Sequence, residues 1–145
     1  MKSKLLTRIT ATLLLTFSIS LSAQEVPVQH SEIPAAAKDF LKEHFKSPFH
    51  HAIKDVENRK ISYEVVLEDN TEIEFSESGK WKEIDGKKKG IPTTFIQKQT
   101  LDYIQKTYPN EAIIKFQTKK RGYEAELSNG LELLFDAQGT FTRLD

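Results

Sequence analysis

The 145-residue sequence contains no cysteine, and this absence excludes several functions at once. Without thiolates there is no cysteine nucleophile, no disulfide, no iron–sulfur cluster and no cysteine-ligated zinc site. The fold is therefore expected to depend on the packing of its core alone. Glycine-rich phosphate loops, Gly-x-Ser-x-Gly elbows and His-Glu-x-x-His motifs are missing as well, so neither a cofactor nor an enzymatic activity is predicted.

The sequence also lacks an excess of charge of either sign. Its 21 Lys and Arg residues balance 21 Asp and Glu residues, which gives a formal net charge of zero at pH 7. A general nucleic-acid binder normally carries a clear basic excess, so no nucleic acid is expected as a partner. Residues 33–85 alone contain 8 basic and 12 acidic side chains, which favours a basic partner for this half.

No apolar run is long enough to cross a membrane as a helix. The stretch from Ile9 to Leu21 has 13 residues, whereas a spanning helix needs about 20. Three basic residues precede this stretch, and Ser22-Ala23 follows it. This order is typical of a secretory signal peptide. We therefore predict a signal peptide over residues 1–23, a periplasmic or secreted protein, and no membrane insertion after cleavage.

The rest of the chain contains an internal repeat. Two stretches return 60 residues later: YEVVLEDN (63–70) as YEAELSNG (123–130), and EIEF (72–75) as ELLF (132–135). The dipeptide Ile33-Pro34 also returns, as Ile91-Pro92. These matches predict four segments after the signal peptide: an N-terminal arm (24–32), repeat 1 (33–86), a basic linker (87–90) and repeat 2 (91–145).

Each repeat is predicted to form one helix followed by four antiparallel strands. The first helix follows from one apolar face with helical spacing, made of Ala37, Phe40, Leu41, His44 and Phe45. A noisier pattern predicts the second helix over residues 93–108. Tyr63, Val65 and Leu67 alternate with a second set of residues, as in a strand with one buried face; the second set is Glu64, Val66 and Glu68. The expected fold is α+β, with both helices on one face of the sheet and the other face open.

These residues resemble a known family. The order Ile-Pro, helix, Tyr-Glu-Val, Asp/Asn turn, Glu-Ile-Glu-Phe, Gly, Trp/Phe and Ile/Leu-Asp is similar to that of the PepSY-like, beta-lactamase-inhibitor-like family of exported bacterial proteins. The likeness covers residues 33–145. It implies tandem helix-plus-four-strand units that build a curved sheet, with the open face available to a protein or peptide. It implies no reaction, since a fold does not fix a function.

The open face is the predicted binding site. Its strand residues are mostly carboxylates, interrupted by two apolar side chains. We predict that this face binds another exported protein or peptide and that inhibition of the partner is one form of this role. The eight predicted contact residues are Glu64, Val66, Glu72, Glu74, Glu124, Glu126, Glu132 and Leu134. An alternative is a small-ligand or cation-binding protein that uses the same acidic face. The carboxylates are equally compatible with a plain solvated face.

The histidines are not predicted to bind a metal. His44 near the helix end could approach His50 or His51, but the spacing matches no recognised ligand set. Adjacent His50 and His51 are expected on opposite sides of a strand. The face that the single tryptophan, Trp81, occupies is left open by the pattern.

Overall fold

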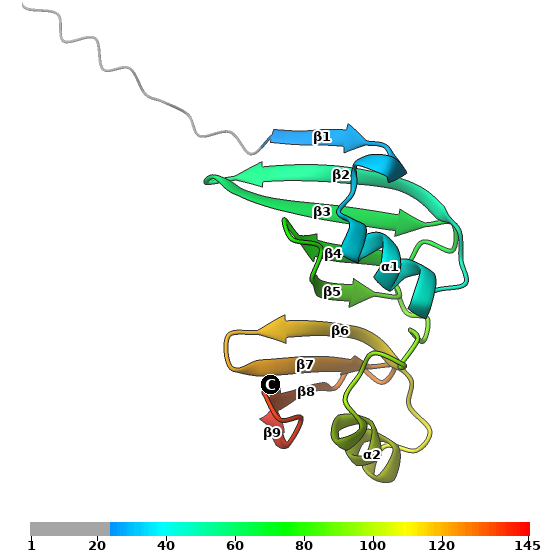
Figure 1. Cartoon of the computed structure of the whole chain (residues 1–145). Coiled ribbons are helices and arrows are strands. Elements are labelled where there is room, and N and C mark those ends of the chain that lie inside the picture. Colours follow the sequence, from blue (N-terminus) through cyan, green and yellow to red (C-terminus); the bar gives the residue numbers. More distant parts are fainter. Residues whose placement is uncertain (1–23) are drawn as a thin grey trace, which may run out of the picture.

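The structure, a computed structural model, describes residues 24–145, so the predicted signal peptide lies outside the described residues. It is an α+β fold with two α-helices and one nine-stranded antiparallel sheet in which every strand pairs with its neighbour in sequence, from β1 to β9 (Figure 1). The sequence predicted the helices, the antiparallel strands and the open face. The sequence left open whether the strands of the two halves are continuous, and the structure joins them in a single sheet.

The first half consists of one α-helix with a strand and a short 3-10 helix before it and four strands after it. They are β1 (Gln24–Val28), the short 3-10 helix η1 (His30–Glu32), α1 (Ala35–His44), β2 (Phe49–Glu57), β3 (Lys60–Leu67), β4 (Glu72–Ser76) and β5 (Trp81–Asp85). Residues 24–32, expected to form an arm, thus contribute a strand that pairs with β2 from Gln24 opposite Val56 to Val28 opposite Ala52. Pro27 lies in this edge strand, the place in a sheet where proline is tolerated.

The second half contains α2 (Lys98–Thr107), β6 (Ile113–Lys119), β7 (Gly122–Leu127), β8 (Glu132–Asp136) and β9 (Phe141–Leu144). The second helix begins later than the predicted residue 93, at Lys98. Ile96, which lies within the range predicted as helical, is buried in the segment before the helix. An apolar residue in a well-packed loop is hard to distinguish from one on a helix by spacing alone.

One hydrophobic core runs along the helix-covered face of the sheet. Neighbouring strands place a row of buried side chains next to one another: Ala52, Val65, Ile73, Ile84, Phe116, Ala125 and Leu133. Ala37 and Leu41 of α1, together with Thr100 and Ile104 of α2, are the buried residues of the two helices that face it. The alternation of buried and exposed residues follows from the two-residue period of a strand.

Trp81 lies on the helix-covered face, which settles what the sequence left open. Its ring packs against Phe40 of α1 and against Phe95, Phe116 and Tyr123 of the second half, with ring centroids between 5.4 and 6.4 Å away. We call these five residues the aromatic cluster. It covers the junction of β5 and β6, where the two halves of the sheet meet through three residue pairs only.

Two glycines let tight turns approach the helices closely. Gly79 in the β4–β5 turn has φ +82°, and a Cβ there would lie 2.8 Å from the amide nitrogen of Ala37. Gly139 in the β8–β9 turn has φ +86°, and its carbonyl accepts a hydrogen bond of 3.2 Å from the buried hydroxyl of Thr100. Gly130 has a similar φ of +83°, but nothing lies within 4 Å of its Cβ position.

These differences predict unequal costs for the same substitution. Gly130→Ala should lower the free energy of unfolding by about 1–2 kcal/mol, the cost of a left-handed conformation for a residue with a Cβ. Gly79→Ala should cost about 1–3 kcal/mol more, since the methyl group also collides with the start of α1. Urea denaturation of both variants measures the difference. Equal midpoints would show that the contact between this turn and α1 is not tight.

Candidate functional site

The face opposite the helices carries all eight residues of the predicted site. Glu64 pairs with Glu74 and Val66 with Glu72, and these residues alternate along their strands with the buried Val65 and Ile73. The second half repeats this arrangement at the equivalent places: Glu124 pairs with Leu134, and Glu126 with Glu132. No helix of residues 24–145 lies over this face (Figure 1).

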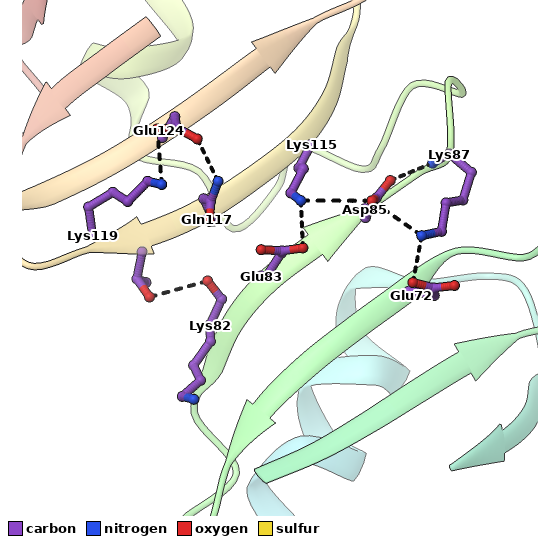
Figure 2. A network of polar contacts seen from close by, with 10 residues as sticks. Glu72, Lys82, Glu83, Asp85, Lys87, Lys115, Gln117, Lys119 and Glu124 are labelled. Carbon is purple, nitrogen blue, oxygen red and sulfur yellow. Dashed lines mark hydrogen bonds and ion pairs between the residues drawn. The ribbon is translucent and has the colours of Figure 1, made fainter. Parts of the chain in front are cut away.

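The eight residues form two groups of four rather than one continuous patch. Strands β5 and β6 lie between the groups, and they contribute a strip that the sequence analysis did not include: Glu83, Asp85, Lys115 and Gln117. Figure 2 shows this strip, with Lys115 on β6 pointing toward Glu83 and Asp85 on β5. The pairing of β5 with β6 could not be derived from local patterns, because these strands are separated in sequence by α2.

Carboxylates face one another across the strands of this surface. Glu74 lies between Glu64 on β3 and Glu83 on β5, and Glu126 lies opposite Glu132. Like charges directly opposite on neighbouring strands are destabilising. Such pairs therefore contribute no stability by themselves.

Three lysines offset part of this repulsion. Lys82 Nζ lies 2.8 Å from Glu74 Oε1, and Lys87 Nζ lies 2.6 Å from Glu72 Oε2. Lys115 Nζ lies 2.7 Å from Glu83 Oε1 and 3.9 Å from Asp85 Oδ2. All the side chains of these pairs are partly exposed, so each contact stabilises by about 1 kcal/mol or less.

The ion pairs hold two of these lysines in their charged form. The pKa of Lys87 is raised, first by its hydrogen bond to Glu72 and further by Asp85. Burial alone would lower the pKa of Lys115, but its hydrogen bond to Glu83 and the charges of Glu83, Asp85 and Glu126 outweigh burial and raise it. Neither lysine is a candidate general base at neutral pH, because a base must be able to lose its proton near that pH.

A hollow of about 300 Å³ opens on the first half of the face, and its charge is negative. Glu25, Asp55, Glu64 and Glu74 line it together with Ile53 and Ser62, and no basic residue does. The Oδ1 atom of Asp55 is buried, and no hydrogen bond to it from another residue of 24–145 is present. Sequence analysis missed Glu25, which belongs to the unpredicted β1, and it did not include Asp55 among the binding residues.

Glu64 shows the electrostatic effect of this hollow. Its pKa is raised above the ordinary value of 4.5, mainly because burial penalises the charged form, and further because of Glu72, Glu25 and Glu74. Lys87 acts in the opposite direction without cancelling the shift. Burial and the neighbouring carboxylates therefore both disfavour the charged form of Glu64.

The second half has a different arrangement around Glu124. Its carboxylate lies on the open face, yet its side chain is only 7 % exposed, with Lys119 Nζ 3.1 Å away and a hydrogen bond of 2.5 Å donated by Gln117. It borders a larger hollow of about 690 Å³ that is also lined by Leu134 and Arg143. A buried carboxylate requires such partners. Glu124 is thus less available to a basic partner than its counterpart Glu64, which is exposed.

The expected orientation of the histidines was wrong in one respect. An irregularity in the pairing of β2 between Phe49 and His51 brings the Nδ1 atoms of His50 and His51 within 2.6 Å of each other, instead of placing the rings on opposite sides. His44 is elsewhere, with its Nδ1 atom 2.7 Å from the hydroxyl of Thr94. In the described part of the chain, the one group of three potential metal ligands contains no histidine; it is formed by Glu124, Glu132 and Asp145.

Comparison with known proteins shows one family. The profile described as "Putative beta-lactamase-inhibitor-like, PepSY-like" matches residues 19–69 and 60–143. The comparison with curated proteins gives no significant match.

Solved structures with the same fold come from two Bacteroides species. A "putative calcium-regulated periplasmic protein" from Bacteroides thetaiotaomicron is 31 % identical, with a TM-score of 0.79 over 83 % of this chain and 96 % of that one. A "putative periplasmic protein of unknown function" from Bacteroides vulgatus is 33 % identical, with a TM-score of 0.79 over 84 % and 99 % of the two chains. A second periplasmic protein from B. vulgatus is 29 % identical over 83 % and 96 %, with a TM-score of 0.77.

The raised pKa of Glu64 predicts how stability depends on pH. The folded state holds the Glu64 proton more tightly than the unfolded chain, so the penalty is present above the folded pKa and disappears as pH falls through it toward 4.5. Glu64→Gln should therefore raise the urea midpoint at pH 7 and have little effect at pH 4. Glu77→Gln, on an exposed turn, provides the control. An equal effect of Glu64→Gln at both pH values would contradict the assigned repulsion.

Proposed function

The chain belongs to the PepSY-like, beta-lactamase-inhibitor-like family, and from this premise we propose that it is a non-enzymatic exported protein whose open sheet face binds another exported protein or peptide. The three periplasmic relatives support the proposed export, and the predicted signal peptide over residues 1–23 agrees with it. The two α-helices of residues 24–145 have 10 residues each, too short to cross a membrane.

We further infer that the two halves are tandem copies of a unit of one helix and four strands. The strand register supports this inference, because Tyr63 pairs with Phe75 and Tyr123 with Phe135, at the same offset of 60 residues as in the sequence. In this view β1 is an addition to the first copy. A face built twice from one unit continues in line across both halves, which suits an extended partner.

The observation that carries the binding proposal is the acidic hollow of the first half. Four carboxylates line it, no cation does, and the pKa of Glu64 is raised, mainly by burial and further by repulsion from neighbouring carboxylates. A lysine or arginine side chain of a partner would remove that repulsion on binding, whereas folding gains nothing from it. The partner is therefore proposed to present a basic segment. Complementary charge of this kind raises both the association rate and the specificity of a complex.

Inhibition of the bound partner is one form that the proposed binding takes, and the family description is its support. The description indicates no catalytic class, which favours a protein that acts by binding. The ion pairs of the central strip also favour this role. Glu83, Asp85 and Lys115 connect two strands through these ion pairs, so their charged groups are engaged with one another and are not free to react with a substrate.

A pair of matched variants tests which face binds. Val66→Lys combined with Leu134→Lys places two cations on the open face, and Gln105→Lys combined with Thr107→Lys adds the same charge on the exposed surface of α2. The proteins are immobilised and exposed to a periplasmic extract. We expect the first double variant to lose partners, enriched in basic proteins, that the wild type and the second double variant retain. Equal recovery by all three would exclude the open face.

A second candidate function is the binding of a cation, and calcium is the specific case. Carboxylate oxygens of Glu124, Glu132 and Asp145 all lie within 4.8 Å of one another, and a relative is described as calcium-regulated. Calcium takes six to eight oxygen ligands, so backbone carbonyls or water would have to complete this set. Lys119, at 3.1 Å from Glu124, would have to move aside.

Calorimetric titration with calcium separates this candidate from the first. If the three carboxylates bind calcium, Glu132→Gln should weaken binding by about tenfold, which is the loss expected for about 1.4 kcal/mol. Glu77→Gln should leave it unchanged. A flat titration with the wild type would rule out calcium and leave the partner-binding proposal intact.

A further inference from the structure

A hollow of about 450 Å³ lies on the other side of the sheet, between η1, α1 and the start of β2. It is independent of the open face. Its apolar lining consists of Leu41, Phe45, Phe49 and Leu67, of which Leu41 and Leu67 belong to the core. Figure 1 shows that the end of α1 and the start of β2 lie at the same end of the sheet. The volume is within the range of about 300–1,000 Å³ that is typical of small-molecule sites.

The border of this hollow is basic. Lys38 and Lys42 are one helical turn apart in α1, and Lys46 follows two residues after the helix ends. The Nζ atom of Lys38 donates a hydrogen bond of 3.3 Å to the carbonyl of Ser31. Within residues 24–145, no carboxylate oxygen forms an ion pair with Lys42 or Lys46, and the single acidic residue of the lining is Asp39. The charge of this border is therefore not used inside the protein.

The second half of the chain contains a natural comparison. Phe40-Leu41 of α1 corresponds to Tyr103-Ile104 of α2, so Leu101 and Gln105 occupy the places of Lys38 and Lys42. The hollow there measures about 160 Å³ and contains no lysine. The same packing of helix on sheet thus forms without the basic residues. The lysines of the first half are consequently not required by the fold.

We propose that the hollow beside α1 binds a medium-chain carboxylate, with its alkyl chain on the apolar floor and its headgroup at Lys42 and Lys46. The apolar residues supply the gain from removing the chain from water. The two lysines supply positive charge that no carboxylate of residues 24–145 neutralises. A ligand with only one of these two parts would lose the contribution of the other, so both parts are needed for full affinity.

Three probes test the two halves of this recognition separately. Decanoate, below its micelle concentration, is titrated calorimetrically into the purified protein, and decanol and acetate serve as the neutral and the short comparison. We expect decanoate to bind at least about tenfold more tightly than either comparison, a difference of about 1.4 kcal/mol. No binding of decanoate, equal affinity for decanol, or equal affinity for acetate would each overturn the proposal.

Matched variants locate the site. Lys42→Gln combined with Lys46→Gln removes two charges at the hollow, and Lys106→Gln combined with Lys60→Gln removes two elsewhere. Lys42 and Lys106 both lie in the last turn of their helices. We expect the first pair to weaken decanoate binding by about tenfold, since each exposed charge contact contributes up to about 1 kcal/mol. The second pair should retain wild-type affinity, and equal affinity in both would overturn the assignment.

A thermal melt of each variant accompanies the titrations. The four lysines are exposed, so all midpoints should stay close to that of the wild type. If the Lys42→Gln, Lys46→Gln variant has a lower melting midpoint than the wild type, the role of the lysines is tested instead by titrating the wild-type protein with decanoate at increasing salt concentration. Decanoate binding should then weaken through screening, and binding that is insensitive to salt would overturn the role of the lysines.

Discussion

The junction of β5 and β6 is the constraint on which the rest of the molecule depends. Three residue pairs connect these strands, fewer than connect any other neighbours in the sheet except β8 and β9. On the helix side the aromatic cluster covers the junction, and on the open side Lys115 lies between Glu83 and Asp85. Because packing and ion pairing reinforce one short ladder, two small helix-and-strand halves share a single sheet, a single core and a single open face.

This continuity explains how the open face tolerates its charge. Carboxylates that face one another across strands destabilise a sheet, and here their repulsion is offset by Lys82 and Lys87 in the first half and by Lys115, which connects β6 to β5. The compensation is uneven. It reaches Glu72, Glu74 and Glu83, while the hollow around Glu64 remains negative and Lys119 compensates the charge of Glu124. The two halves therefore have one backbone arrangement and two different electrostatic surfaces.

The sequence predicts the features that depend on local periodicity and misses those that depend on pairing. Alternation along β3, β4, β7 and β8 correctly placed all eight site residues on one face, because side chains alternate regardless of which strand lies next. It could not reveal that Glu25 would join Asp55 beside Glu64, since β1 has no repeat counterpart in the second half. The irregular pairing near His51 likewise reversed the expected side of one histidine, because one extra residue shifts a side chain to the other face.

The differences between the halves also separate the requirements of folding from those of binding. The residues that face the core correspond closely, as Leu41 does to Ile104 and Ile73 to Leu133, and these positions are buried in both halves. The residues around the hollows do not: Lys42 corresponds to Gln105, and Glu74 to Leu134. Substitutions at such exposed positions cost little stability. The surface residues of one half could thus change while both halves retained the same fold. The acidic hollow and the hollow beside α1 lie on opposite sides of the sheet. A partner on the open face and a carboxylate beside α1 would therefore not compete for space.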